Sequence, residues 1–138
     1  MFQKVNYQEL NSKQKEIYNF QKIAAVLADY GFNCIKLSDD WLHADFLAYH
    51  YDKEETLKIQ LKSRLTIGRD YIGKNLYIAF PSSIHDKWIV IPHDILLSIV
   101  EQVSPMWLQS HSWIEDGGYS IATLSKAMHE AIHEYEIG

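Results

Sequence analysis

The sequence has little cysteine and no long apolar run, and each shortage excludes a class of protein. Cys34 is the only cysteine among 138 residues, so an internal disulfide and a thiolate metal site are both excluded. No apolar stretch is long enough to span a membrane, and the opening segment MFQKVNYQEL lacks the apolar core of a signal peptide. We therefore expect a cytoplasmic protein with no membrane partner.

Several familiar sequence signatures are also missing. There is no Gly-rich phosphate loop of the Walker type, no nucleophile elbow and no aromatic signature of RNA binding. Internal repeats, low-complexity tracts and linkers rich in Pro, Gly or Ser are absent as well. With 47% hydrophobic and 22% charged residues, positions 1–138 are expected to fold as a single globular domain.

Positive charge is in the minority but is concentrated in one segment. The formal net charge of −5 argues against a protein that coats nucleic acid through bulk charge. Positions 58–74 nevertheless contain one acid, Asp70, against five cations. These cations are Lys58, Lys62, Arg64, Arg69 and Lys74. A basic segment on an acidic chain predicts a local site that faces phosphate.

Hydrophobic periodicity predicts an α/β (α+β) sandwich around one mixed sheet. A first helix is expected to begin at Asn11 or Ser12 and to end at Gly31. Its apolar stripe is formed by Ile17, Phe20, Ala24 and Leu27. Strands are expected at 32–38, 44–51, 57–65, 76–81 and 87–92. A polar connection at 39–43, an acidic one at 52–55, a short irregular or helical crossover at 65–75 and a turn at 82–86 join them.

The last third of the chain is expected to be helical. One helix begins just after Pro92 and covers 93–102. Gly117 and Gly118 mark a turn before a final amphipathic helix. The apolar stripe of this helix is formed by Ile121, Leu124, Met128, Ile132 and Tyr135.

The strand at 57–65 is apolar on one face and polar on the other. Lys58, Gln60, Lys62 and Arg64 share the polar face. If a loop centred on Lys53 and Glu54 joins this strand to the preceding one, opposed residue numbers sum to 107. Asp45 then lies opposite Lys62, and on the same face as Gln60.

The first helix is expected to bring a further carboxylate to these residues. Glu16 lies in the register of the inward face of the helix, where a carboxylate needs a partner. If the helix covers the polar face of the sheet, Glu16 approaches Asp45, Gln60 and Lys62. Asp45 and Gln60 could then supply oxygen ligands to a hard cation such as Mg²⁺, and Lys62 could orient a water and stabilise negative charge on phosphate.

Glu16 on the opening helix, Asp45 on one strand and Gln60-Leu61-Lys62 on the next resemble the PD-(D/E)XK nuclease superfamily. The resemblance implies a restriction-endonuclease-like αβββαβ core within 12–103, followed by a C-terminal helical extension, 104–138. It implies that Asp45, Gln60, the Leu61 backbone carbonyl and Glu16 bind Mg²⁺ or Mn²⁺, and that Lys62 assists the attacking water. Ala44 replaces the usual proline, and Gln60 replaces the usual acid, as in the Gln-x-Lys variant of some family members.

The sequence therefore predicts a metal-dependent nuclease acting on nucleic acid, with DNA favoured over RNA. The candidate catalytic residues are Lys62, Asp45, Gln60 and Glu16. The candidate phosphate contacts are Lys58, Arg64, Arg69 and Lys74, which should position the backbone without reading its sequence. A homodimer is expected, because cutting both strands of a duplex usually takes two sites.

Alternative interpretations remain open at each of these residues. The lysines of the polar strand face could be solvated, and Asp45 could cap the turn after Trp41. Glu16 could be stabilised by the positive end of the helix dipole. A nuclease-like fold could also have lost catalysis and bind nucleic acid or a protein partner. The segment HEAIH matches a zinc-peptidase pattern through His129 and His133, but few residues follow to supply a third ligand, so a solvated helix face is preferred.

Overall fold

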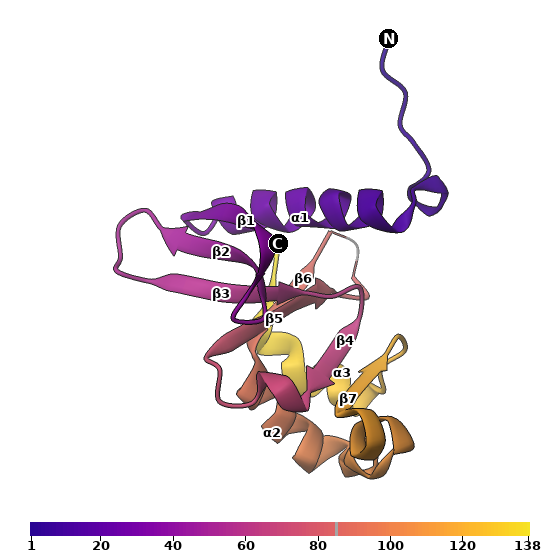
Figure 1. The fold of residues 1–138 in the computed structure, drawn as a ribbon. Coiled ribbons are helices and arrows are strands. Elements are labelled where there is room, and N and C mark those ends of the chain that lie inside the picture. The colour runs from indigo at the N-terminus through magenta and orange to yellow at the C-terminus, as the bar shows by residue number, and fades with distance from the viewer. Residues whose placement is uncertain (85) are drawn as a thin grey trace.

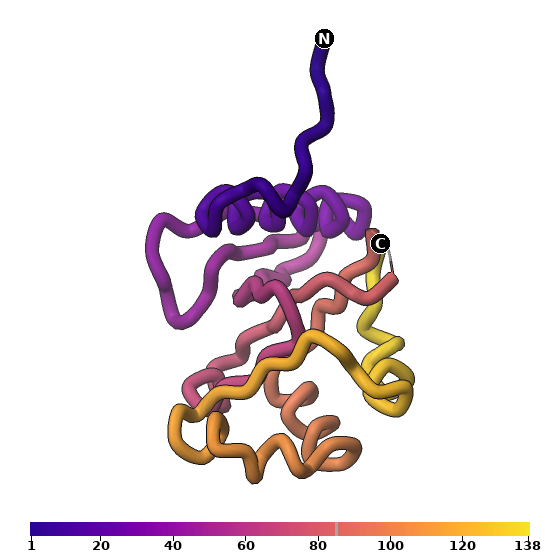
Figure 2. Tube along the Cα trace, turned by 90° about the vertical axis from the view of Figure 1, so that its right-hand side faces the viewer, coloured from indigo at the N-terminus to yellow at the C-terminus, as the bar shows by residue number. Residues whose placement is uncertain are grey.

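The computed structural model describes residues 1–84 and 86–138 of the chain. A long first helix lies on one side of a central sheet, and the remaining helices and a small second sheet lie on the other side (Figures 1 and 2). The helices and helical turns are η1 (Tyr7–Glu9), α1 (Ser12–Ala28), η2 (Arg69–Tyr71), α2 (His93–Val103), η3 (Pro105–Gln109), η4 (Ser112–Asp116), α3 (Lys126–Ile132) and η5 (His133–Tyr135). The strands are β1 (Phe32–Trp41), β2 (Ala44–His50), β3 (Thr56–Leu61), β4 (Leu65–Gly68), β5 (Leu76–Pro81), β6 (Trp88–Pro92), β7 (Gly118–Ile121) and β8 (Glu136–Ile137).

The central sheet is mixed. Its six strands are arranged in the order β1-β2-β3-β5-β6-β8, with β3 and β5 parallel and every other neighbouring pair antiparallel. The connection between the parallel strands contains β4 and η2, and β4 pairs with β7 in a second, two-stranded sheet. The predicted mixed α/β (α+β) architecture is confirmed.

Helix α1 begins where the sequence predicts. The side chain of Asn11 accepts a hydrogen bond from the backbone N–H of Gln14, and the side chain of Gln14 accepts one from Asn11. This capping box satisfies two N–H groups that the first turn leaves without partners. Gly31 follows the helix with a φ of 89°, a left-handed conformation that glycine adopts without strain.

Helix α1 covers the apolar face of β3, not its polar face. Ile23 and Leu27 of α1 are buried against Ile59 of β3 and Phe46 of β2. The expectation that the helix covers the polar face is therefore wrong. The physical reason is that the apolar stripe of an amphipathic helix gains most when it removes other apolar surface from water. Ile17, which was placed in that stripe, is exposed.

A larger core fills the opposite side of the central sheet. Its buried residues come from β2, β4, β5, β6, α2 and α3. They include Ile67, Ile78, Ile91, Leu96, Val100, Met128 and Ile132. The C-terminal segment thus supplies part of the main core, because Met128 and Ile132 of α3 are both buried there.

Several local predictions differ from the structure. The strand predicted at 57–65 ends at Leu61, and the crossover that follows begins with a separate strand, β4. Strand β1 continues through Asp39 and Asp40 to Trp41, so the predicted connection at 39–43 shrinks to a two-residue turn. The last helix begins at Lys126, because 118–121 form β7 and pair with β4. The β2–β3 hairpin pairs Phe46 with Ile59, so opposed residue numbers sum to 105 instead of 107.

The two-residue shift in the hairpin keeps every side chain on its predicted face, since strand faces alternate with a period of two. It does change the direct neighbours, because continuing the observed register sets Asp45 opposite Gln60 and not opposite Lys62. The predicted turn at 82–86 includes His85, which lies outside the described residues. Within the described ranges, no helix has both the length and the apolar character needed to cross a membrane.

Candidate functional site

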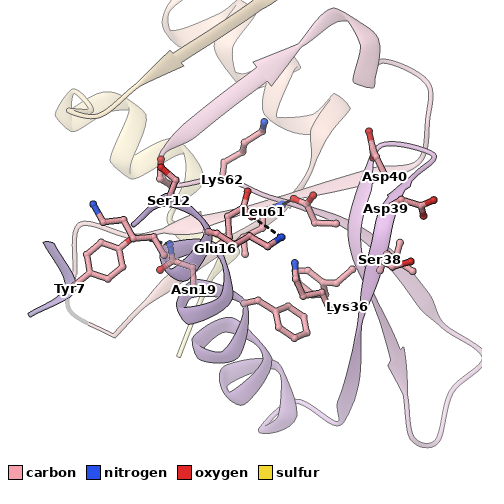
Figure 3. Close-up of a pocket in the computed structure, with 17 residues that line it drawn as sticks. Tyr7, Ser12, Glu16, Asn19, Lys36, Ser38, Asp39, Asp40, Leu61 and Lys62 are labelled. Atoms are coloured by element: carbon pink, nitrogen blue, oxygen red, sulfur yellow. Dashed lines mark hydrogen bonds and ion pairs between the residues drawn. The ribbon is translucent and has the colours of Figure 1, made fainter. Parts of the chain in front are cut away.

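A cleft of about 520 Å³ opens where the start of α1, the middle of β1 and the end of β3 meet. Figure 3 shows residues of all three elements lining it, including Glu16 from α1, Asp40 from β1 and Lys62 just after β3. We call it the first cleft. Of the predicted site residues, it contains Glu16, Asp45, Leu61 and Lys62.

Asp45 lies in the wall of this cleft at the start of β2. One carboxylate oxygen, Oδ2, accepts a hydrogen bond of 2.8 Å from the backbone N–H of Leu61 on the neighbouring strand. Burial raises the pKa of this carboxyl above its ordinary 3.8, although that hydrogen bond and the charges of Lys62 and Lys36 act in the opposite direction. Burial therefore outweighs these contacts, and the ionised form of Asp45 is less stable here than in water.

Gln60 lies beside Asp45 but behind the wall of the first cleft. Ile59 points toward α1, so by strand alternation the side chain of Gln60 projects from the other face of β3, whereas Asp45 lines the first cleft below α1. The side-chain oxygen of Gln60, Oε1, is buried and has no hydrogen-bond partner among the described residues. Leaving a buried acceptor unpaired costs about 1–3 kcal/mol. This oxygen is a candidate ligand that the protein itself does not satisfy.

Glu16 reaches the first cleft from the first turns of α1, but in a different setting from the one predicted. Its carboxylate lies 3.5 Å from the ammonium of Lys13, and its side chain is 65% exposed. The prediction of a buried inward carboxylate is wrong, because α1 covers the apolar face of the sheet and this end of the helix lies over the cleft. Glu16 is therefore a solvated carboxylate at the cleft mouth.

Lys62 is held by an aromatic ring. Its backbone N–H donates to the Ala79 carbonyl at 2.8 Å, and this hydrogen bond holds the backbone of Lys62 beside β5. Its ammonium lies 5.8 Å from the ring centre of Tyr71, within the range of a cation–π interaction. The Tyr71 ring also meets His43 and His93 edge to face, at 5.8 and 5.4 Å between ring centres.

His93 fixes the base of this aromatic group. It is 1% exposed, and its Nε2 accepts a hydrogen bond of 3.1 Å from the Gly68 backbone N–H. The ring proton therefore lies on Nδ1 and is donated to Asp94 Oδ1 at 3.0 Å. Burial lowers the pKa of His93, although Asp94 acts to raise it, so the ring is a neutral structural group. A side chain at Gly68 would collide with the Tyr71 ring at 2.9 Å, so glycine permits this packing.

Strand β1 supplies site residues that the sequence did not reveal. The pairing with β2 shifts between Lys36 and Trp41, and the irregular segment between them carries Asp39 and Asp40 into the first cleft. Lys36 enters from the last regular pair before this irregularity. A bulge of this kind depends on long-range strand pairing, and nothing in the local sequence signalled it.

Opposite charges balance in the first cleft. Its lining contains four lysines and four carboxylates. They are Lys13, Lys15, Lys36 and Lys62, and Glu16, Asp39, Asp40 and Asp45. The lining therefore has no formal net charge, and without a bound cation it does not attract a polyanion through bulk charge.

The four predicted phosphate contacts lie outside the first cleft. Lys58 donates from its ammonium to the backbone carbonyl of Lys74 at 2.7 Å. Arg69 donates to the carbonyls of Trp113 and Ile114, which commits its guanidinium to the C-terminal segment. Lys74 is exposed just before β5, and Arg64 lines a different cleft.

This second cleft, of about 590 Å³, lies between the end of β5, the connection from β3 to β4, and the segment around α3. Both histidines of the HEAIH segment line it, His129 partly buried and His133 exposed. Among residues 1–84 and 86–138, no three His, Cys, Asp or Glu side chains are grouped as metal ligands. The zinc alternative thus gains no third ligand, and a metal in the first cleft would rely on neutral oxygens such as the Leu61 carbonyl as well as on Asp45.

Comparison with known proteins does not establish a function for this chain. No family model matches the sequence, and no curated protein matches it. The solved structure of a bacterial homing endonuclease, I-Ssp6803I, is similar with a TM-score of 0.49 and 14% sequence identity, over 91% of this chain and 94% of that one. A TM-score below 0.5 does not establish a shared fold, so the function has to be argued from the residues of this chain.

Proposed function

We propose that this chain is a nuclease that hydrolyses phosphodiester bonds in nucleic acid with the help of Mg²⁺ or Mn²⁺. The observation that carries the proposal is the buried, unpaired oxygen of Gln60, adjacent in the chain to the Leu61 amide that holds Asp45. Burial also raises the pKa of Asp45, so the ionised form of this carboxyl would be stabilised by a nearby cation. Hard divalent cations take such oxygens as ligands.

The donor set fits a weakly held divalent ion. Asp45, the amide oxygen of Gln60 and the Leu61 carbonyl would be its protein ligands, and Glu16 would approach through water from the cleft mouth. The bound ion would polarise a phosphoryl oxygen and lower the pKa of a bound water. Because Gln60 is neutral, one carboxylate carries the charge of the inner ligand set, and modest affinity is expected.

Lys62 would act on the phosphate and on the attacking water. Lys62 lines the same cleft as Asp45, and its ammonium lies 5.8 Å from the centre of the Tyr71 ring. A positioned ammonium stabilises the negative charge that develops on phosphate as the bond to water forms. Lys36, on the β1 side of the cleft, supplies a second positive charge.

The proposed substrate is DNA in preference to RNA. Contacts of lysine and arginine with phosphate position a strand without reading its bases, so cleavage with little sequence preference is expected of these residues. Cutting both strands of a duplex takes two such sites, so the proposal includes a homodimer. Sedimentation of the protein with a short duplex tests that part.

Cleavage assays test the proposal. Wild-type protein with Mn²⁺ should cleave DNA, a chelator should stop the reaction, and Lys62→Ala should abolish it while the variant stays folded. Lys53→Ala is the matched control, because Lys53 lies in the β2–β3 loop away from the first cleft. Equal cleavage by wild type and Lys62→Ala would remove Lys62 from the mechanism, and absence of wild-type cleavage of DNA and RNA would reject the nuclease.

Crystals soaked in Mn²⁺ test the metal separately. An anomalous peak between Asp45, Gln60 and the Leu61 carbonyl is expected. A peak elsewhere would move the site. No peak, with or without a bound oligonucleotide, would argue against metal catalysis at this cleft.

A binding module without catalysis is the second candidate. It is favoured by the exposure of Glu16 and its pairing with Lys13, since this carboxylate is not held toward Asp45. Such a module would bind nucleic acid or a protein partner, and the association would survive both chelation and Asp45→Ala. Loss of binding under either condition would exclude it.

A further inference from the structure

The first and second clefts share a wall. Ser63 lines both of them, with Lys62 on the side of the first cleft and Arg64 on the side of the second. Two residues of chain span at most about 7 Å, so the backbones of Lys62 and Arg64 are no further apart than that. Consecutive phosphates of a nucleic-acid strand have a comparable separation. A strand held at Lys62 can therefore present its neighbouring phosphate to Arg64.

The second cleft offers hydrogen-bond donors to such a phosphate. The guanidinium of Arg64 donates through Nε to the Ser120 hydroxyl at 3.1 Å, which orients it, and no other partner of its side chain occurs among the described residues. His129 and His133 face the same space from the C-terminal side. Hydroxyls of Ser82 and Ser83 approach from the end of β5.

One carboxylate opposes an anion in this cleft. Glu136 of β8 lines it and accepts a hydrogen bond of 2.8 Å from the Ser82 hydroxyl. The carboxylate of Glu136 therefore opposes the guanidinium of Arg64 in the lining of this cleft. This opposition gives a test with two signs, because removing Arg64 and removing the charge of Glu136 should move the affinity for an anion in opposite directions.

We propose that the second cleft is a phosphate subsite, which holds a phosphate of the same strand that lies at Lys62, with Arg64, His129 and His133 as its donors. The placement of the first phosphate rests on the proposed function. The recognised chemistry is a phosphodiester, and the second cleft extends the path of the strand from the first cleft across Ser63.

Binding of a labelled single-stranded DNA, followed by anisotropy in a chelating buffer, tests the subsite without cleavage. Arg64→Gln should weaken binding roughly tenfold, as expected for one charged contact worth about 1.4 kcal/mol, and should lower the salt slope by about one. Arg64→Lys should recover part of the loss. Glu136→Gln, which keeps an acceptor for Ser82, should tighten binding several-fold.

Matched variants change the net charge equally outside both clefts. Lys53→Gln and Glu101→Gln, in the β2–β3 loop and in α2, serve this purpose. Effects of Arg64→Gln and Glu136→Gln that are no larger than those of the controls would overturn the subsite. Thermal unfolding of each variant identifies any that fail to fold. If Arg64→Gln fails to fold, the affinities of Arg64→Lys and Glu136→Gln test the subsite in its place.

Two further readouts separate the sources of failure. If Mn²⁺ supports no cleavage but the two-sign pattern in binding persists, the nuclease fails and the subsite stands. If cleavage occurs without the pattern, only the subsite fails. Inorganic phosphate is the remaining arm: Arg64-dependent phosphate binding, with oligonucleotide affinity unchanged in Arg64→Gln, would assign the cleft to a free anion and overturn the strand path.

Discussion

Replacing Gln60 by methionine should make the protein more stable and less able to bind metal. The change Gln60→Met removes the buried oxygen that has no partner and keeps an unbranched chain of similar length. An unpaired buried acceptor costs about 1–3 kcal/mol, and its removal should raise the free energy of unfolding by that amount in metal-free buffer. At this chain length each kcal/mol corresponds to about 3–5 °C in Tm.

Calorimetry in a chelating buffer, followed by titration with Mn²⁺, measures both halves of this prediction. Gln21→Met is the matched control, because Gln21 is exposed on α1 and should leave Tm nearly unchanged. Metal should raise the Tm of wild type, by about 2.7 kcal/mol of stabilisation at a hundredfold excess over Kd, and should do little to Gln60→Met. The difference in Tm between Gln60→Met and wild type should therefore shrink or change sign as Mn²⁺ is added.

Two results would refute this reasoning. A metal-free Gln60→Met variant that is less stable than wild type would mean that the amide makes favourable interactions that outweigh the unpaired oxygen. An unchanged response to Mn²⁺ would mean that the Gln60 oxygen is not a ligand, and the donor set would lose its second member.

Four further predictions concern the same region and its surroundings. Burial raises the pKa of Asp45 above 3.8, so its ionisation in the folded state lowers the free energy of unfolding as the pH rises from 3.8 through the raised pKa. Metal-free Asp45→Asn should therefore be more stable than wild type at neutral pH. Urea unfolding should show this gain in stability vanishing below pH 3.8. Gln60→Glu should bind Mn²⁺ at least about tenfold more tightly by titration calorimetry and be less stable without metal, because it adds a second buried carboxylate; equal affinity would contradict the ligand assignment. Tyr71→Leu should slow cleavage about two- to fivefold by loss of the cation–π contact with Lys62, and Tyr71→Phe should not; equal rates in the two variants would remove the ring from the mechanism. Burial raises the pKa of Cys34 from 9.0 to about 11, so alkylation of the folded protein should be about a hundredfold slower than that of the urea-unfolded chain, and similar rates would show the thiol to be accessible as a thiolate.

Local signals in the sequence predict much of the fold. Asn11 caps α1 because its side chain can accept a backbone hydrogen bond, and the alternation of 57–61 specifies which side chains of β3 share a face. Both signals depend on neighbouring residues only. The start of α1 and the strands β2 and β3 could therefore be predicted.

Features that depend on distant pairing could not be predicted in the same way. The spacing of Ile121 from Leu124 suits a helix. Ile121 nevertheless lies in strand β7 and pairs with Leu65 of β4, more than fifty residues away in the sequence. The register of the hairpin was off by two because the loop length was inferred from charge and not from backbone geometry. The side of the sheet covered by α1 could have been inferred, since the apolar face of β3 is the one that needs cover.

In the candidate site, too, features that depend on distant strand pairing could not be predicted from the local sequence. Asp45 and Lys62 both line the first cleft, but not as directly opposed residues, because the hairpin register differs by two from the predicted one. Asp39 and Asp40 were missed, since they enter the cleft only through the irregular pairing of β1 with β2. Tyr71 was missed because its contact with Lys62 depends on η2 folding back between β4 and β5.

The balance of charge in the first cleft has a kinetic consequence under the proposed function. Four lysines opposed by four carboxylates give an incoming phosphate strand no electrostatic advantage, and a divalent ion bound at Asp45 would shift the lining to two positive charges. Assembly would then be ordered, with metal first and strand second. The rate of strand capture would follow the concentration of free divalent ion, so nucleic acid and metal would have to be present together before the enzyme turned over.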